Sequence, residues 1–425
     1  MKKISLLIFA CALVMTSCKD KQFQKYTANV PIYTDFETFR STLGKVQYQD
    51  AREIEQKGNI YFKDNFLFIL DNYKGIHIMD NSNPSAPVNK GYYALTGITG
   101  ISIKNQYLYA NAYTDLVVID VSAIDNPTEV GRAENVFDRA LPSYNPQYPL
   151  AEVDQTKGVI TGWEVKEYRT DKEPIGGCFN CVTWTGAESA LFSVDVAFSN
   201  GAGSQGQGVS GSITKFSLVG NYLYVMDGNN LKPFDLSSPI RPLNTNEEFI
   251  WREVETLFAY NNHIFMGTTT GMLIYETTNK NAPTQIGVIQ HANACDPVVV
   301  DGDYAYVTLR TGTVCSGQQN QLDVIDVSDY TNPDLKKTYS LKNPHGLGIK
   351  NNTLYVCDGS AGLKIFDASN PIEVGNNKIK TYGNVQATDI ILLENIAMII
   401  GDDGLHQYDI SDVDNISKIS TINFK

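Results

Sequence analysis

The sequence predicts an all-β fold, a seven-bladed β-propeller of four-stranded blades with a long loop insertion between blades 2 and 3. Three observations predict it. A short apolar strand that ends in an acid recurs along the chain, mostly at intervals of about 40 residues, the length of one propeller blade. A turn rich in Ser, Asn and Pro follows most copies, and a second apolar strand precedes each one. The composition agrees, since 24 Tyr, 18 Phe and 33 Gly favour strands and tight turns.

Seven copies of the repeated strand are present, and each is identified by the acid at its end. They are "GIHIMD" (Asp80), "DLVVID" (Asp120), "NLKPFD" (Asp235), "GMLIYE" (Glu276), "QLDVID" (Asp326), "GLKIFD" (Asp367) and "GLHQYD" (Asp409). In turns such as "DNSNP", an Asp or Ser side chain can accept from a backbone N–H two residues on, and Pro fixes the backbone. Each repeat therefore predicts one blade: strands A and B come first, the acid-ended strand is strand C, and the acidic turn leads into strand D.

The extra residues between Asp120 and Asp235 leave an alternative open. An eighth blade would have to lie there, and residues 189–198, "SALFSVDVAF", are strand-like, but no acid-ended copy follows them. Pro233 predicts an irregular strand C in the third blade, because proline cannot donate to a neighbouring strand. We expect seven blades over residues 58–425, with the insertion at about residues 135–212.

The repeats resemble the LVIVD-repeat β-propeller family, named for the strand that appears here as "LVVID" (116–120) and "LDVID" (322–326). The resemblance covers about residues 58–425. The stretches "KGIHIMDNSNPSAP" and "LYANAYTDLVVIDVS" look especially like lipoproteins of this family from the Bacteroides group. The resemblance implies a propeller and says little about activity.

The N-terminal residues predict export and lipidation. Residues 1–17 carry two lysines and a short apolar run, as a signal peptide does, and Cys18 follows small residues in a pattern that resembles a bacterial lipobox. We expect Cys18 to be lipidated, residues 18–57 to form a tether and a segment at the rim, and the protein to be an outer-membrane lipoprotein on the periplasmic or cell-surface side. The formal net charge of −13 argues against nucleic acid as a partner.

Long loops predict which face of the propeller is functional. The insertion lies in a D-to-A connection and residues 310–321 lie in a B-to-C loop, so both are expected on one face, where binding sites are common. Four cysteines lie in or beside these loops: Cys178, Cys181, Cys295 and Cys315. We expect disulfides between Cys295 and Cys315 and between Cys178 and Cys181, with redox or metal-binding thiols as alternatives for the latter pair. Cys357, within a strand, is expected to be buried.

Aligning the first residues of the innermost strands predicts a ring around the channel mouth on the same face. The ring consists of Gly58, Thr99, Thr214, Glu255, Asp296, His345 and Thr388, with Asp389 one position further on. Glu255, Asp296, His345 and Asp389 could hold a divalent cation or a polar ligand. The alternative is that these polar side chains only solvate the channel.

Four aromatic residues near this face could stack on a ligand or pack the insertion against the disc: Tyr73, Tyr113, Trp163 and Trp184. His77 and His406 share a position in strand C of adjacent blades, where we expect surface histidines. The sequence contains no G-x-S-x-G, P-loop or H-E-x-x-H motif. We therefore expect a monomeric binding scaffold for an envelope or extracellular protein or glycan. The alternative is a metal-assisted hydrolase or lyase for a sugar or lactone.

Overall fold

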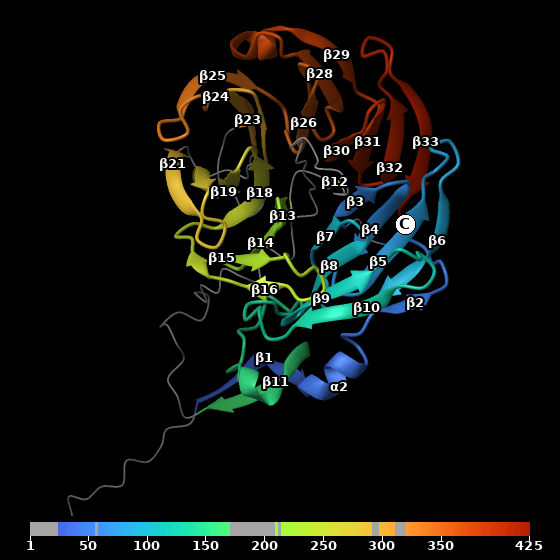
Figure 1. Cartoon of the computed structure of the whole chain (residues 1–425), viewed down its shortest axis with the longest axis vertical. Coiled ribbons are helices and arrows are strands. Elements are labelled where there is room, and N and C mark those ends of the chain that lie inside the picture. The colour runs from blue at the N-terminus through green and yellow to red at the C-terminus, as the bar shows by residue number, and fades with distance from the viewer. Residues whose placement is uncertain (1–23, 56–57, 171–208, 211–213, 291–296, 311–319) are drawn as a thin grey trace, which may run out of the picture.

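The structure, a computed structural model, describes residues 24–55, 58–170, 209–210, 214–290, 297–310 and 320–425. Seven antiparallel sheets stand around a central axis, which confirms the predicted β-propeller and its seven blades (Figure 1). In each blade the four main strands follow chain order from the axis to the rim, because each pairs with the next through a turn or loop. None of the described helices is both long and apolar enough to cross a bilayer.

Each blade is one continuous stretch of chain. Blade 1 contains β3 (Ile60–Lys63), β4 (Phe66–Asp71), β5 (Gly75–Asp80) and β6 (Val88–Ala94). Blade 2 contains β7 (Ile101–Lys104), β8 (Tyr107–Ala112), β9 (Asp115–Asp120) and β10 (Thr128–Ala133). Blade 3 contains β13 (Phe216–Val219), β14 (Tyr222–Asp227), β15 (Asn230–Asp235), β16 (Leu243–Asn244) and β17 (Glu248–Phe249). Blades 4 and 5 contain β18 (Val254–Tyr260), β19 (His263–Thr268), β20 (Gly271–Glu276) and β21 (Thr284–Gln290); and β22 (Val298–Asp301), β23 (Tyr304–Leu309), β24 (Gln321–Asp326) and β25 (Asp334–Ser340). Blades 6 and 7 contain β26 (Leu347–Lys350), β27 (Thr353–Cys357), β28 (Leu363–Asp367), the 3-10 helix η3 (Pro371–Asn376) and β29 (Lys378–Tyr382); and β30 (Asp389–Leu392), β31 (Ile396–Gly401), β32 (Gly404–Asp409) and β33 (Ser417–Asn423).

The acidic turn after strand C has the predicted geometry. In six blades the carboxylate accepts from the backbone N–H two residues on, over 2.8 to 3.0 Å: Asp80, Asp120, Asp235, Asp326, Asp367 and Asp409. In blade 4 the carboxylate of Glu276 instead accepts from the Thr278 hydroxyl at 2.9 Å. The repeated acid therefore fixes the turn into strand D.

The outer strand of blade 3 is split, which follows from Pro233 in the middle of β15. Proline donates no hydrogen bond, and β15 pairs with two short strands, β16 at one end and β17 at the other. Thr245, between them, donates its N–H to the Pro233 carbonyl at 3.0 Å. Strand C itself is regular, so the predicted irregularity was wrong for β15, and the break falls in strand D instead.

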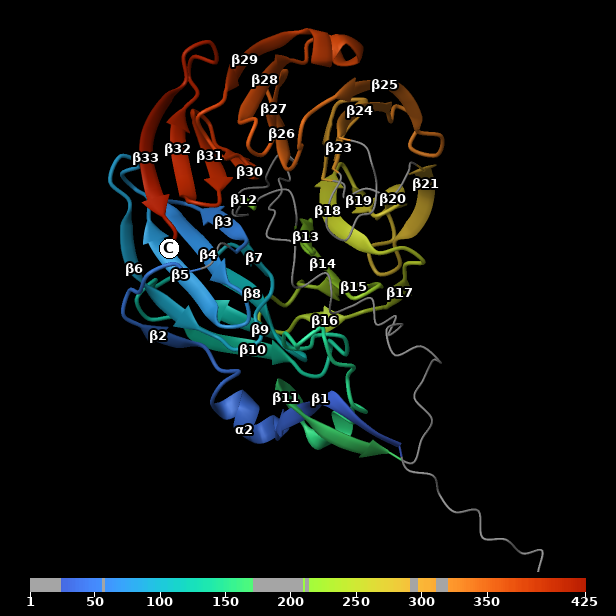
Figure 2. The ribbon, with the colours of Figure 1, turned by 180° about the vertical axis from the view of Figure 1, so that it is seen from behind.

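Residues 24–55 and the insertion contain strands and helices that the sequence did not predict. β1 (Gln24–Thr34) pairs along its length with β11 (Val159–Thr170), and together they form a two-stranded ribbon outside the ring. Helix α2 (Phe36–Ser41) follows β1, and β2 (Gln47–Gln49) adds an outer strand to blade 1. Figure 2 shows the ribbon and α2 below blade 2. The 3-10 helix η2 (Gln155–Lys157) precedes β11, and β12 (Val209–Ser210) pairs with the innermost strand of blade 1.

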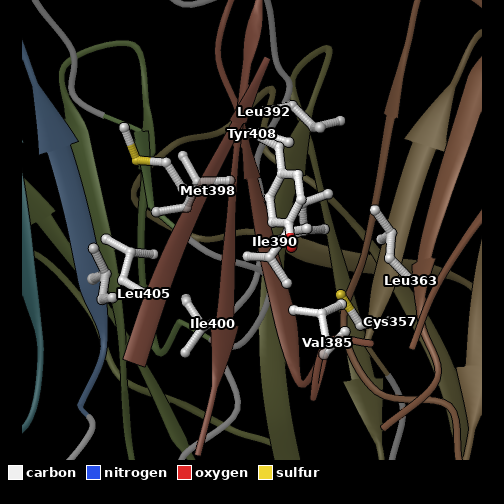
Figure 3. Close-up of a cluster of buried hydrophobic side chains, with 14 of the residues drawn as sticks. Cys357, Leu363, Val385, Ile390, Leu392, Met398, Ile400, Leu405 and Tyr408 are labelled. Atoms are coloured by element: carbon white, nitrogen blue, oxygen red, sulfur yellow. The ribbon is translucent and has the colours of Figure 1, made fainter. Parts of the chain in front are cut away.

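The core lies between neighbouring blades, because both faces of each sheet are covered. Figure 3 shows one such cluster, where Leu363 of blade 6 and Ile390 and Leu405 of blade 7 are all fully buried. Cys357 is buried in this cluster, which confirms the prediction. Side chains of two successive blades thus fill each gap, and the ring depends on these packed interfaces.

Blade 7 packs against blade 1 without any exchange of strands. The side-chain amides of Asn81 and Gln407, both buried, exchange two hydrogen bonds of 2.9 and 2.7 Å across this seam. The N–H of Lys425 donates to the Ile54 carbonyl at 2.9 Å, so the last residue meets the segment before blade 1. Polar pairing and side-chain packing therefore close the ring.

Candidate binding face

The pairing between strands A and B places the predicted ring residues at equivalent positions. Each lies two residues before an A-strand residue that occupies the same register in its blade: Ile60, Ile101, Phe216, Leu257, Val298, Leu347 and Ile390. In blade 4 Glu255 lies at a β-bulge between Val254 and Thr256, whereas in blade 6 His345 lies two residues before β26. Asp296 lies outside the described residues. The repeat sets where these residues lie in each blade, and what each could bind depends on the contacts of its side chain.

His345 is held by protein groups on both ring nitrogens. Its side chain is buried, with Arg310 Nη1 at 2.8 Å from Nδ1 and the Asn343 side-chain amide at 3.0 Å from Nε2. A guanidinium only donates, so Nδ1 is the acceptor in its contact with Arg310, while Nε2 lies against the side-chain nitrogen of Asn343. A metal ion would have to displace one of these partners.

The carboxylates of the ring lie at different depths. Asp389 is fully buried, whereas Glu255 is half-buried. Thr388 bonds back to its own blade, since its hydroxyl donates to the Ile400 carbonyl at 2.9 Å. Among the residues that the structure describes, no three His, Cys, Asp or Glu side chains converge as metal ligands.

Asp115 is the first of three buried carboxylates that fix segments at this face. It lies at the start of β9 with no exposed surface and accepts from Arg40 Nε at 2.8 Å, Arg132 Nη1 at 2.9 Å and the Asn135 N–H at 2.9 Å. Each guanidinium has a second carboxylate partner, at 2.7 Å for Arg40 and 2.9 Å for Arg132: Glu134 and Glu129. Burial acts to raise the pKa of Asp115, but the hydrogen bonds from Arg40, Asn135 and Arg132 outweigh burial and lower the pKa. Asp115 thereby ties α2 and the start of the insertion to blade 2.

Asp227 fixes the insertion to blade 3 in a similar way. Its oxygens accept from the N–H groups of Asp138 and Arg139, at 3.0 and 3.2 Å. The buried ammonium of Lys232 lies 3.0 Å from Asp227, 3.2 Å from Asp138 and 3.3 Å from Glu247. Burial, followed by the hydrogen bond with Asp138, raises the pKa of Asp227 to about 6. One lysine thus links two loops to strand C.

Asp358 occupies the same register in blade 6 as Asp227 in blade 3. It is fully buried and accepts from the N–H groups of Lys342 and Asn343, the latter at 2.6 Å. Lys364 on strand C pairs with it at 2.5 Å. Asp358 therefore fixes the loop that carries Asn343 beside His345. Together, the carboxylates of three blades hold the connections of one face.

Of the four predicted stacking residues, the structure describes three, of which one is buried and two are half-buried. Tyr113 is 2 % exposed and packs against Phe39 of α2, with ring centroids 6.0 Å apart. Trp163 donates from Nε1 to the Pro142 carbonyl at 2.9 Å, and its ring meets Tyr144 edge-on. Tyr73 is half-buried beside Tyr113. The insertion and α2 use these rings as packing, and the expectation of ligand stacking at Tyr113 was wrong.

Several predicted residues lie outside the described residues, and the structure says nothing of them: Cys18, Cys178, Cys181, Trp184, Cys295 and Cys315. The expectation of surface histidines was wrong for both positions. His77 and His406 are 1 % and 3 % exposed, because strand C is covered by the neighbouring blade. Burial lowers the pKa of His77 to about 4.

Sequence reasoning missed the most exposed aromatic pair at this face. Trp251 is 89 % exposed and Phe249 is 44 % exposed, in the connection from blade 3 to blade 4. Their ring centroids lie 4.9 Å apart at an interplanar angle of 83°. The stretch "FIWRE" carried a signal, because two aromatics alternate with a single apolar residue beside polar ones.

Comparison with known proteins now bears on this geometry. The model of the LVIVD repeat matches residues 57–95, 98–134, 210–243, 293–340 and 345–376. The chain carries LVIVD repeats. These matches fall on blades 1, 2, 3, 5 and 6 of the propeller, and the structure shows the same four strands in blades 4 and 7.

Solved structures share the fold at low identity. The periplasmic gluconolactonase PpgL of Pseudomonas aeruginosa is 8% identical, with 89% of this chain and 96% of that one covered and a TM-score of 0.52. The computationally designed protein Ika8 (11% identical, 89% and 91% covered, TM-score 0.49) and BamB of Moraxella catarrhalis (10% identical, 89% and 92% covered, TM-score 0.48) are also similar. At these identities the likeness concerns the fold alone. No match was found among the curated proteins.

Proposed function

We propose that this LVIVD-repeat propeller is a lipid-anchored scaffold of the bacterial cell envelope that binds a protein or a glycan through its long-loop face. The observation that carries the proposal is the set of buried carboxylates, Asp115, Asp227 and Asp358, which hold the connections of that face against the blades. Loops fixed on a rigid scaffold bind without a large ordering cost. A recognition surface needs loops that are held in place before the partner binds, as these loops are.

The lipid anchor is the first part to test. Cys18 precedes β1 by six residues, and β1 is joined to the disc through β11 and α2. Cells that express the full chain are labelled with a radioactive fatty acid and fractionated. We expect label and outer-membrane location for the natural sequence, and loss of both for Cys18→Ser. A Cys18→Ser protein that still carries the label would contradict lipidation at this residue.

The binding role is tested by shortening the insertion. A variant in which a Gly-Ser linker replaces residues 171–208 keeps β11 and β12, so it retains the ribbon and blade 1. Photo-crosslinking in intact cells, with the natural chain and the variant side by side, measures partner capture. We expect a discrete crosslinked product that the variant loses while its melting temperature stays within a few degrees. Equal capture by both proteins would contradict a partner site that needs the insertion.

A metal-assisted hydrolase or lyase acting on a sugar or lactone is the second candidate. The position of Glu255 and His345 near the entry to the innermost strands of blades 4 and 6 favours it, with Asp296 and Asp389 as further ligands for a divalent cation. The protein contacts on both nitrogens of His345 weigh against it. The test is turnover of lactones with and without chelator, compared with Glu255→Gln. Activity that resists both changes would reject this candidate.

A further inference from the structure

Phe249 and Trp251 form an exposed aromatic corner that the scaffold does not use for its own packing. Their rings meet nearly at right angles, and 89 % of Trp251 is exposed. We propose that this corner is a binding site for a neutral saccharide, one sugar ring of which stacks its apolar face on the Trp251 indole. The inference deepens the proposed function, on which it rests, by assigning the ligand class and the residues.

The backbone under the corner is rigid. Phe249 pairs with Asn230 across β15 and β17, and the N–H of Ile250 donates to the Asn229 carbonyl at 2.8 Å. Ile250 is 1 % exposed and belongs to the core between blades 3 and 4. Phe249 and Trp251 therefore flank Ile250, whose backbone and side chain are both held in place. An indole has only two side-chain torsions to fix, so binding there has a low entropic cost.

Two charged side chains beside the corner, Glu247 and Arg252, already have protein partners, which favours a neutral ligand. Glu247 accepts from the Asn230 side chain and lies 3.3 Å from the Lys232 ammonium, while 46 % of its own side chain is exposed. Arg252 Nη1 donates to the carbonyl and hydroxyl of Thr270, at 3.1 and 3.0 Å. A carboxylate has about four lone-pair sites, so Glu247 can still accept from a sugar hydroxyl. Its pairing with Lys232 weakens any attraction for a cation.

The size of the corner also selects the ligand. An aromatic side chain buries about 150–250 Å², so the exposed parts of these two rings offer roughly 300 Å² together. A standard protein interface needs about 800 Å² on each partner. The corner is therefore too small for a protein interface by itself, whereas one or two sugar rings would cover it. Amphipathic rings of this kind suit a ligand with an apolar face and a polar edge.

The experiment is a titration of the full chain with neutral hexasaccharides. The probes are maltohexaose, cellohexaose, mannohexaose, xylohexaose and chitohexaose, and the readouts are tryptophan fluorescence and calorimetry. We expect at least one probe to bind saturably with a blue shift of the emission. Trp251→Ala should weaken that binding at least tenfold, and Phe249→Ala should weaken it by a smaller factor. Leu243→Ala is the matched control, because Leu243 is 63 % exposed in the same blade and lies outside the corner.

Three results would overturn the inference. They are no saturable binding to any of the five probes, equal binding by the natural chain and Trp251→Ala, and binding of choline or a lysine peptide in place of sugars. The melting temperature of each variant shows that it is folded, and changes at such exposed positions are usually small. Partner capture by Trp251→Ala separates the two proposals. Capture without sugar binding would reject the corner and leave the scaffold role intact.

Discussion

Replacement of Asp115 by asparagine is the sharpest test of how the long-loop face is held together. Asp115 is fully buried and joins α2, the start of the insertion and blade 2 through one carboxylate. Asparagine has nearly the same shape and removes the charge. The change therefore tests whether charge at this point, and not packing, holds the segments.

The magnitude follows from the hydrogen bonds that Asp115 accepts. One oxygen accepts from Arg40 Nε at 2.8 Å and Arg132 Nη1 at 2.9 Å, and the other accepts from Arg40 Nη2 at 3.1 Å and the Asn135 N–H at 2.9 Å. In either orientation, the NH₂ of asparagine would face at least two donors. Removal of one partner from a buried ion pair costs about 3–5 kcal/mol. Because each guanidinium keeps a second carboxylate, we expect a loss of about 3 kcal/mol.

The assay is denaturant unfolding of Asp115→Asn at pH 7, with limited proteolysis of residues 24–55 as a local readout. The matched control is Asp120→Asn, at the opposite end of the same strand. There the carboxylate caps one turn N–H, a bond that asparagine can also make, so we expect a change below about 0.5 kcal/mol. If both variants lose the same stability, the reasoning about Asp115 is refuted.

The pH dependence gives a second check on the same variant. The folded pKa of Asp115 lies below its ordinary value of 3.8, so its contribution is fully present above pH 3.8 and is lost as the pH falls through the folded pKa. The stability difference between the natural chain and Asp115→Asn should be constant from pH 5 to 8. A difference that already shrinks between pH 7 and 5 would contradict this sign.

Three further predictions concern other buried polar groups. Lys232→Met leaves buried Asp227 without its cation and should lower the free energy of unfolding by about 1–3 kcal/mol at pH 7. Since the pKa of Asp227 is raised to about 6, its protonation should reduce this loss at pH 5, as denaturant unfolding at the two pH values would measure. His77→Gln should reduce the loss of stability on acidification. Because the pKa of His77 is about 4 in the folded chain and 6.5 when unfolded, His77 lowers the free energy of unfolding of the natural chain by about 2.5 kcal/mol between pH 7 and 4.5. Denaturation curves of the natural chain and the variant at both pH values measure this difference. Asn81→Leu removes the donor to Oε1 of buried Gln407 and should cost about 1–3 kcal/mol, whereas Asn81→Leu combined with Gln407→Leu should recover part of that loss.

The propeller could be predicted because its signals are local. A strand end, an Asp and a Ser lie within a few residues of one another, so "DLSSP" states the turn that Asp235 and Ser237 make. The ribbon could not be predicted in this way. β1 pairs with β11 across more than a hundred residues, and nothing within Gln24–Thr34 names its partner. Its pairing depends on contacts that form only when blade 2 is in place.

The face was predictable, but the roles of its residues were not. The period of the repeats sets which residues enter strand A, although a β-bulge at Glu255 in blade 4 interrupts the register. Whether His345 meets Arg310 depends on the packing of two blades, which no single repeat contains. His77 was expected at the surface because strand C varies in polarity there. Trp251 was missed because its exposure depends on how the split outer strand of blade 3 turns toward blade 4.

The closure of the ring has a consequence for how such a chain can be rearranged. Every blade is one uninterrupted stretch, and blades 1 and 7 meet without sharing a strand. Lys425 lies within hydrogen-bond distance of Ile54, so a short linker could join the two ends of the disc. Circular permutants opened between any two blades would then keep every four-stranded sheet whole. The same modularity allows duplication or loss of a whole blade as a single genetic event, with only the seam to be repacked.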